Sequence, residues 1–232
     1  MPRIDAVLFD LGGTLAEYFT REQFPRVLAQ ALGEVSACLA ERGLPLPTEA
    51  DFRARVEAED HTASDYRVRP LEGRLARIYG LTEASADAAL LDAICRRWLR
   101  PVFALGRVYP DSIPLLQWLR RAGFRTAILS NSPWGSPAAP WREEVARLGL
   151  TPLVDEVLFC GDVGWRKPAS PIFLEAMRRL DLPAERCVFV GDDPRWDLAG
   201  PQALGMPALL IDRTGQSGDL HSLAELEARL SR

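Results

Sequence analysis

An aspartate and two glycines follow an apolar run near the start of the chain. The segment Val7-Leu8-Phe9-Asp10-Leu11-Gly12-Gly13-Thr14-Leu15 is typical of a buried strand that ends in a carboxylate and then breaks into a tight loop. Open α/β sheets bind ligands at the carboxyl ends of their strands, and glycines there let backbone amides approach an anion. Asp10 is therefore a candidate nucleophile facing a phosphate, unless the segment is an ordinary strand-to-helix turn.

Further polar groups follow other apolar runs, or precede helices, later in the chain. Ser130-Asn131 ends one run, Gly191-Asp192-Asp193 ends another with Asp197 just beyond it, and Lys167 precedes a helix between the two. At one edge of a parallel sheet these groups would meet Asp10. Ser130 could then donate to a phosphate oxygen, and Lys167 could neutralise charge. Asp192 could help to hold Mg2+, which binds through one or two carboxylates and the phosphate of a substrate.

Lys167 also stands out by composition. Of the 28 basic residues it is the single lysine, and the other 27 are arginines. Because a planar guanidinium and a compact ammonium are not interchangeable, a chain that otherwise uses arginine marks Lys167 as a place where a point charge is needed.

Five apolar runs have the length and composition of strands, and helix-like segments separate them after the second run. This alternation predicts an α/β fold with a doubly wound parallel sheet. Ser170-Pro171 predicts a helix N-cap, and the residues from Ser222 to Glu225 predict a capping box. The runs are Ala6 to Phe9, Thr126 to Leu129, Val157 to Phe159, Cys187 to Val190 and Ala208 to Ile211.

Roughly 115 residues separate the first two runs, far more than one crossover helix needs. Apolar residues recur at helical spacing from Phe24 to Leu39, and further helices are predicted to begin at Thr48 and to span Pro70 to Tyr79 and Thr82 to Leu99. We expect a helical insertion domain at residues 17–103 and an α/β core at residues 1–16 and 104–232. Prolines are expected at the edges and turns of the insertion: Pro45, Pro47, Pro101 and Pro110.

Composition and net charge restrict the classes of function that we expect. The 232 residues are 47% hydrophobic and carry a formal net charge of -4, which favours a small anionic substrate over nucleic acid. Neither a signal peptide nor a membrane span is apparent, so we expect a cytoplasmic protein without a membrane partner. Four widely spaced cysteines suggest buried thiols rather than a zinc site or disulfides. The sequence does not predict the oligomeric state.

Four segments, in this order, resemble the four motifs of the haloacid dehalogenase superfamily. They are VLFDLGGTL, ILSNS, GWRKPASPIF and FVGDDPRWDLAGPQALGM, and they span nearly the whole chain. The helical insertion resembles the type-one cap that this family places between its first two motifs. The resemblance implies a Rossmann-like core and a phosphatase that uses magnesium (Mg2+).

The resemblance also implies roles for individual residues. Asp10 would form a covalent aspartyl-phosphate that water then hydrolyses, and Lys167 would balance the charges. Mg2+ would bind to Asp10, Asp192 and the backbone carbonyl of Gly12. Ser130 and the backbone amides of Gly13 and Asn131 would cradle the phosphate, Thr14 would brace the loop, and Asp193 and Asp197 would orient metal-bound waters. Asp193 and Asp197 could equally be the favourable charges of a helix N-terminus.

Gly12 departs from the family pattern. Phosphatases of this family usually carry a second aspartate there, which protonates the leaving oxygen and then activates water. A positioned acid or base contributes about a hundredfold to ten-thousandfold. Glu17, His61 or Asp65 could replace it, although nothing in the sequence singles out any of them.

Two functions other than a phosphatase are also compatible with the sequence. A phosphate-binding or regulatory protein without catalytic activity would explain Gly12. A 2-haloacid dehalogenase, which attacks carbon and needs no metal, is disfavoured by Gly12 and by the acidic cluster from Asp192 to Asp197. Several residues could also meet the substrate, or could simply be solvated or packed in the core: Tyr18, Arg21, Arg67, Arg69, Trp134, Trp141 and Trp165.

Overall fold

Five parallel strands form the central sheet of the protein. The computed structural model describes residues 3–59, 63–82 and 85–231. The strands lie in the order β5-β4-β1-β6-β7, and each neighbouring pair is parallel, which confirms the predicted α/β fold. Their bounds are Glu156–Phe159 for β5, Arg125–Ser130 for β4, Ala6–Phe9 for β1, Cys187–Gly191 for β6 and Ala208–Leu210 for β7.

The register of the sheet brings the polar strand ends together. Phe9 at the end of β1 is level with Ile128 on β4 and with Val190 on β6. The residues just beyond these positions, Asp10, Ser130 and Asp192, therefore emerge side by side at one edge of the sheet.

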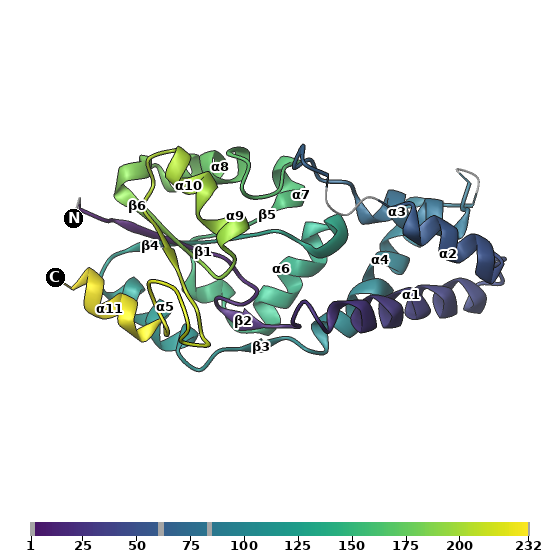
Figure 1. The fold of residues 1–232 in the computed structure, drawn as a ribbon, viewed down its shortest axis with the longest axis horizontal. Coiled ribbons are helices and arrows are strands. Elements are labelled where there is room, and N and C mark those ends of the chain that lie inside the picture. Colours follow the sequence, from purple (N-terminus) through teal and green to yellow (C-terminus); the bar gives the residue numbers. More distant parts are fainter. Residues whose placement is uncertain (1–2, 60–62, 83–84, 232) are drawn as a thin grey trace.

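Helices cover both faces of the sheet because its strand residues alternate in direction. Val7 and Phe9 belong to a core with α5, α6 and α11, whereas Ala6 and Leu8 belong to a second core with α8. Figure 1 shows α8 and α10 on one side of the sheet and α5 and α11 on the other. The bounds are Ser112–Arg121 for α5, Ala138–Arg147 for α6, Pro171–Leu180 for α8, Ala199–Ala203 for α10 and Ala224–Leu230 for α11.

Four helices gather at the opposite end of the molecule from the chain termini (Figure 1). The apolar stripe predicted from Phe24 forms α1, whose buried positions pack against α4. Thr48 caps α2 by accepting a hydrogen bond from the Asp51 amide, as the sequence indicates. The bounds are Phe24–Glu41 for α1, Glu49–Glu57 for α2, Leu71–Tyr79 for α3 and Ala88–Phe103 for α4.

The last of these helices differs from the prediction at both ends. It begins at Ala88 rather than Thr82, because Asp87 accepts a hydrogen bond from the Leu90 amide and caps the helix there. Pro101 lies inside α4, not at an edge of the insertion. The buried side chains of Leu99 and Val102 continue the apolar face past Pro101, and this packing offsets the hydrogen bond that proline cannot make.

Short elements complete the fold. β2 (Ala16–Glu17) pairs antiparallel with β3 (Arg107–Val108), where the chain leaves and re-enters the sheet domain. Ser170 occupies the N-cap position of α8 without a side-chain hydrogen bond, and Glu225 accepts from the Ser222 amide, which is half of the predicted box. The remaining bounds are Cys160–Val163 for α7, Pro194–Asp197 for α9, and Pro133–Gly135, Thr151–Leu153 and Ala184–Arg186 for three 3-10 turns.

Two expectations from composition concern the chain as a whole. All four cysteines are buried and free of disulfide bonds. Over the described ranges, every helix is too short or too polar to cross a bilayer.

Candidate active site

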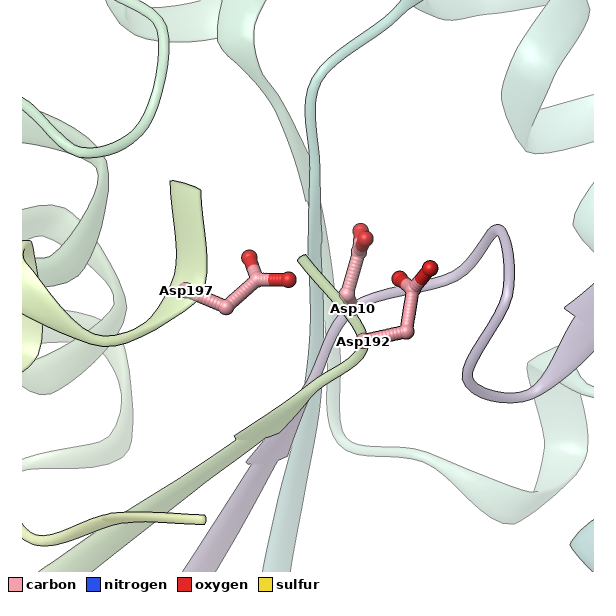
Figure 2. Close-up of side chains that lie close together, drawn as sticks. All are labelled: Asp10, Asp192 and Asp197. Carbon is pink, nitrogen blue, oxygen red and sulfur yellow. The ribbon is translucent and has the colours of Figure 1, made fainter. Parts of the chain in front are cut away.

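Three carboxylates meet at the carboxyl edge of the sheet. Asp10 follows β1, Asp192 follows β6, and Asp197 ends α9; one oxygen from each lies within 4.8 Å of the others. Figure 2 shows Asp10 between Asp192 and Asp197. Hard oxygen ligands in this number suit a divalent cation such as Mg2+. Asp10 and Asp192, two of the three predicted ligands, are thus placed together with chemistry that fits the predicted metal.

Gly13 makes room for Asp192 beside Asp10. Its φ is +80°, and a Cβ atom at this position would lie 2.2 Å from the Asp192 Oδ2. The site requires glycine here, both for the backbone conformation and for the close approach of the carboxylate.

Lys167 is buried among the carboxylates. Its side chain is 1% exposed, and Nζ lies 2.9 Å from the Asp10 Oδ1 and 2.7 Å from the Asp197 Oδ1. A buried charge needs such partners, and the short ammonium reaches both of them at once. The lone lysine of the sequence thus has a specific electrostatic environment.

Asn131 fixes the backbone of Lys167. The Lys167 amide donates to the Asn131 Oδ1 (2.8 Å), and the Asn131 Nδ2 donates to the Lys167 carbonyl (3.2 Å). Sequence reasoning assigned only the backbone amide of Asn131 and missed this side-chain role. The available signal for this role was a polar residue just beyond a strand, but its hydrogen-bond partner, Lys167, lies 36 residues away in the chain.

The charged groups of the cluster shift one another's pKa values. Burial alone would lower the pKa of Lys167, but the Asp10 and Asp197 carboxylates outweigh it and raise that pKa. Desolvation and repulsion from Asp10 and Asp197 raise the pKa of Asp192 to about 8. Since the Asp192 residue is solvent-exposed, we attribute its shift chiefly to the neighbouring charges. Desolvation raises the pKa of Asp197 to about 6, against the opposing effect of Lys167. A bound cation would relieve this crowding of negative charge.

The loop after Asp10 is held by its own backbone. The Leu11 amide donates to the Asp10 Oδ1 (2.7 Å), which orients the carboxylate. The Gly13 amide, expected to face phosphate, instead donates to the Ala16 carbonyl (2.8 Å), because the loop closes into a tight turn. Thr14 is fully buried, but its hydroxyl has no hydrogen-bond partner within the described part of the chain; its carbonyl accepts from Arg213 (2.7 Å). Thr14 therefore braces the loop through its backbone and packing rather than its hydroxyl.

A pocket of about 210 Å³ opens beside Asp192 and contains most of the predicted phosphate-binding residues. Its lining joins the loop after β1 to the end of β4, as the strand register requires. The lining residues are Leu11, Gly12, Gly13, Tyr18, Phe19, Ser130, Asn131, Pro133, Trp141 and Asp192.

Two of the predicted substitutes for a carboxylate at Gly12, Glu17 and Asp65, do not line this pocket. Glu17 is exposed on β2, and Asp65 forms an ion pair with Arg69 (3.0 Å). His61 lies outside the described residues. Gly12 itself has open space, since a Cβ atom there would come no closer than 3.7 Å to the Tyr18 ring. Within the described ranges, Asp192 is the one acidic residue that lines the pocket.

Asp193 has a different position from Asp197. It caps α9 by accepting a hydrogen bond from the Arg195 amide (3.0 Å), and its Oδ2 lies 2.6 Å from the Arg21 guanidinium. Asp197, in contrast, bonds Lys167 and accepts from the Asp193 amide (3.0 Å). The helix-cap alternative therefore accounts for Asp193, whereas Asp197 belongs to the charged cluster.

Comparison with known proteins gives a matching family model, two similar relatives and a similar solved structure. The family model for haloacid dehalogenase-like hydrolases matches residues 4–205. The glyceraldehyde 3-phosphate phosphatase of Methanothermobacter thermautotrophicus is 30% identical over 90% of this chain and 86% of its own, and the phosphoglycolate phosphatase of Xanthomonas campestris is 31% identical over 88% and 81%. The crystal structure of a 2-haloacid dehalogenase from Pseudomonas syringae has a TM-score of 0.71 and 27% identity, covering 99% of each chain.

Proposed function

Since this chain belongs to the haloacid dehalogenase-like hydrolase family, we propose that it is a magnesium-dependent phosphatase for a small phosphorylated metabolite. The observation that carries the proposal is the meeting of Asp10, Asp192 and Asp197 around the buried ammonium of Lys167. The curated relatives named as phosphatases support the same reaction class.

In the proposed reaction, a carboxylate oxygen of Asp10 attacks phosphorus. An O–P bond forms and the P–O bond to the leaving group breaks; the leaving oxygen departs as an anion and takes its proton from solvent. Water then attacks the phosphorus of the aspartyl-phosphate and the bond to the Asp10 oxygen breaks, which restores the carboxylate; one proton of the water stays on the released phosphate and the other passes to solvent. The contacts of Asp10 with the Leu11 amide and Lys167 hold the nucleophile in one orientation during both steps.

Asp10, Asp192 and the Gly12 carbonyl would hold Mg2+, which supplies positive charge to the phosphate oxygens. Ser130 and the backbone near Asn131 would bind those oxygens from the side of β4. Asp197 would position Lys167, whose ammonium it bonds (2.7 Å).

We further propose that α1 to α4, within residues 17–103, act as a cap over this site. Two backbone hydrogen bonds link this region to the core: the Val68 amide donates to the Gly164 carbonyl (3.0 Å), and the Arg166 amide donates to the Tyr66 carbonyl (2.8 Å). These bonds join the segment before α3 to the segment before Lys167.

The two alternatives predict different behaviour. A dehalogenase would not need the acidic cluster, whereas Asp192 lies within reach of Asp10 in a way that suits a metal. A phosphate-binding protein without turnover is favoured by Gly12, and it would bind phosphate but never form the aspartyl-phosphate.

Lys167→Arg is expected to lower kcat roughly tenfold to a hundredfold. The guanidinium is longer and branched, so a 1%-exposed site between two carboxylates cannot hold it without displacing Asp10. Steady-state kinetics on an aryl phosphate measure the effect, and thermal unfolding checks that the variant is folded. Full activity in the folded variant would contradict a special role for the ammonium.

The proposed function is tested by assaying the metal-free protein against aryl and alkyl phosphate esters and against 2-haloacids, with and without Mg2+. Phosphate release only with Mg2+ is the expected result. In Asp192→Asn, the Mg2+ concentration for half-maximal thermal stabilisation should rise at least about tenfold, since a charged ligand is lost. Asp193→Asn is the matched control, because Asp193 faces Arg21 instead. Metal-independent halide release, or an unchanged Mg2+ titration in Asp192→Asn, would contradict the assignment.

A further inference from the structure

A second pocket lies between the cap helices and the core. Its volume is about 320 Å³, within the range of roughly 300–1,000 Å³ that is usual for small-molecule sites. It shares Phe19, Asn131 and Pro133 with the pocket of about 210 Å³ beside Asp192, so the two pockets are adjacent. A substrate whose phosphate is at Asp10 would extend its other end into this second pocket.

Arginine is the one charged residue type among the described lining residues of this pocket. Five arginines line it, and no aspartate or glutamate is found among its described lining residues. The arginines are Arg67, Arg69, Arg74, Arg166 and Arg195.

Three of these arginines have a carboxylate partner. Asp65 pairs with Arg69 (3.0 Å), Glu59 pairs with Arg74 (3.1 Å), and Asp193 lies 3.4 Å from Arg195. The Arg67 guanidinium instead lies over the Trp165 ring, 4.4 Å from its centroid, and forms no ion pair with a carboxylate in the described ranges. Arg67 is therefore a cation available to an anionic group in the pocket.

Arg74 lies in the same wall, and its buried guanidinium is paired with Glu59. It is 5% exposed, its Nη1 lies 3.1 Å from Glu59, and its guanidinium lies 5.7 Å from the Trp134 ring. Burial lowers the pKa of Arg74 from its usual value. Because Glu59 already pairs with Arg74, Arg67 is the lining arginine on which binding of a further anion chiefly depends.

Aromatic side chains form the other walls: Phe19, Phe24, Trp134 and Trp196. Trp134 has a φ of 56°, which is rare for a bulky residue, and it is only 8% exposed. Gly135 follows with a φ of +69°, where a Cβ atom would lie 2.2 Å from the Arg69 carbonyl. Trp134 thus has a strained backbone conformation beside the arginines that line the pocket. Strained backbone conformations are often found at ligand-binding positions.

We infer that this pocket selects a substrate that carries a second anionic group, a carboxylate or a phosphate, separated from the reacting phosphate by an apolar or planar spacer. The inference rests on the proposed phosphatase function and names the substrate class of that site. The arginines would bind the second anion, and the aromatic walls would contact the spacer.

The test uses three aryl phosphates that differ only in one group. They are 4-methylphenyl, 4-(carboxymethyl)phenyl and 4-(phosphonomethyl)phenyl phosphate, whose phenols are similar leaving groups. We expect kcat/KM to be about tenfold or more higher for at least one anionic ester than for the methyl ester, mainly through KM. The carboxymethyl and phosphonomethyl arms distinguish a carboxylate from a phosphate at this position.

Variants then assign the preference to the pocket. Arg67→Gln should reduce the ratio of kcat/KM between the anionic and methyl esters at least about threefold, and Arg67→Lys should keep most of it, because the charge remains. Arg53→Gln is the matched control: Arg53 is an exposed arginine on α2 that pairs with Glu49 (2.9 Å) and does not line the pocket. Equal kcat/KM for all three esters, or an unchanged ratio in Arg67→Gln, would overturn the inference while leaving the phosphatase function intact. Failure to hydrolyse any of the three would instead contradict the proposed function.

Discussion

Asp10→Asn is expected to abolish turnover, with a loss of at least about ten-thousandfold in kcat. The amide has nearly the shape of the carboxylate, so the loop and the contact with the Leu11 amide can persist. An amide oxygen is a far weaker nucleophile toward phosphorus, and the variant also loses one of the two anions that face Lys167. Phosphate release from an aryl ester measures the loss, while circular dichroism and thermal unfolding report on the fold.

A second measurement separates nucleophilic attack from simple binding. Acid-quenched protein analysed by mass spectrometry should contain an aspartyl-phosphate on Asp10 during turnover, and Asp10→Asn should lack it. Asp5→Asn is a control, because Asp5 lies before β1 and pairs with Arg186, remote from the pocket. Near-native turnover in Asp10→Asn, or a phosphate found on another residue, would rule out the covalent mechanism.

The sheet and its polar edge were predictable because both rest on local sequence. The five apolar runs formed the five strands, and parallel register then required Asp10, Ser130 and Asp192 to emerge together. The lone lysine was a compositional signal that a point charge is needed at Lys167, and its position between Asp10 and Asp197 agrees with that prediction.

Contacts between distant segments were not predictable in the same way. The two hydrogen bonds between Asn131 and Lys167, and the ion pair of Arg21 with Asp193, depend on how loops meet after folding. From the sequence, Arg67 and Arg69 could simply be solvated residues of the insertion, since nothing local in the sequence shows that Arg67 and Arg195 face one cavity. Pro101 was misplaced for a related reason, because tertiary packing of α4 overrides the local preference of proline.

The missing acid at Gly12 should make activity depend on the leaving group. An aryl phosphate leaves as a stable anion, whereas an alkoxide needs a proton that no side chain at position 12 supplies. Natural protein is therefore expected to hydrolyse aryl esters much faster than alkyl esters, and kcat should fall steeply as the pKa of the leaving alcohol rises. Dephosphorylation of Asp10 lacks its usual base for the same reason, so the phosphorylated protein should accumulate enough to detect.

Gly12→Asp is expected to raise the turnover of alkyl phosphates by roughly tenfold to a thousandfold, because a positioned acid or base contributes on that scale. The pocket can admit the side chain: the nearest atom to a Cβ at position 12 is a Tyr18 ring carbon at 3.7 Å, and Gly12 does not have a positive φ. Gly12→Asn is the matched control, since the amide has the same shape and cannot exchange the proton, and it should give no gain. A plot of kcat against leaving-group pKa should flatten only in Gly12→Asp. If natural protein already hydrolyses alkyl and aryl esters at equal rates, and Gly12→Asp adds nothing, then another residue supplies the proton and Gly12 is no catalytic deficit.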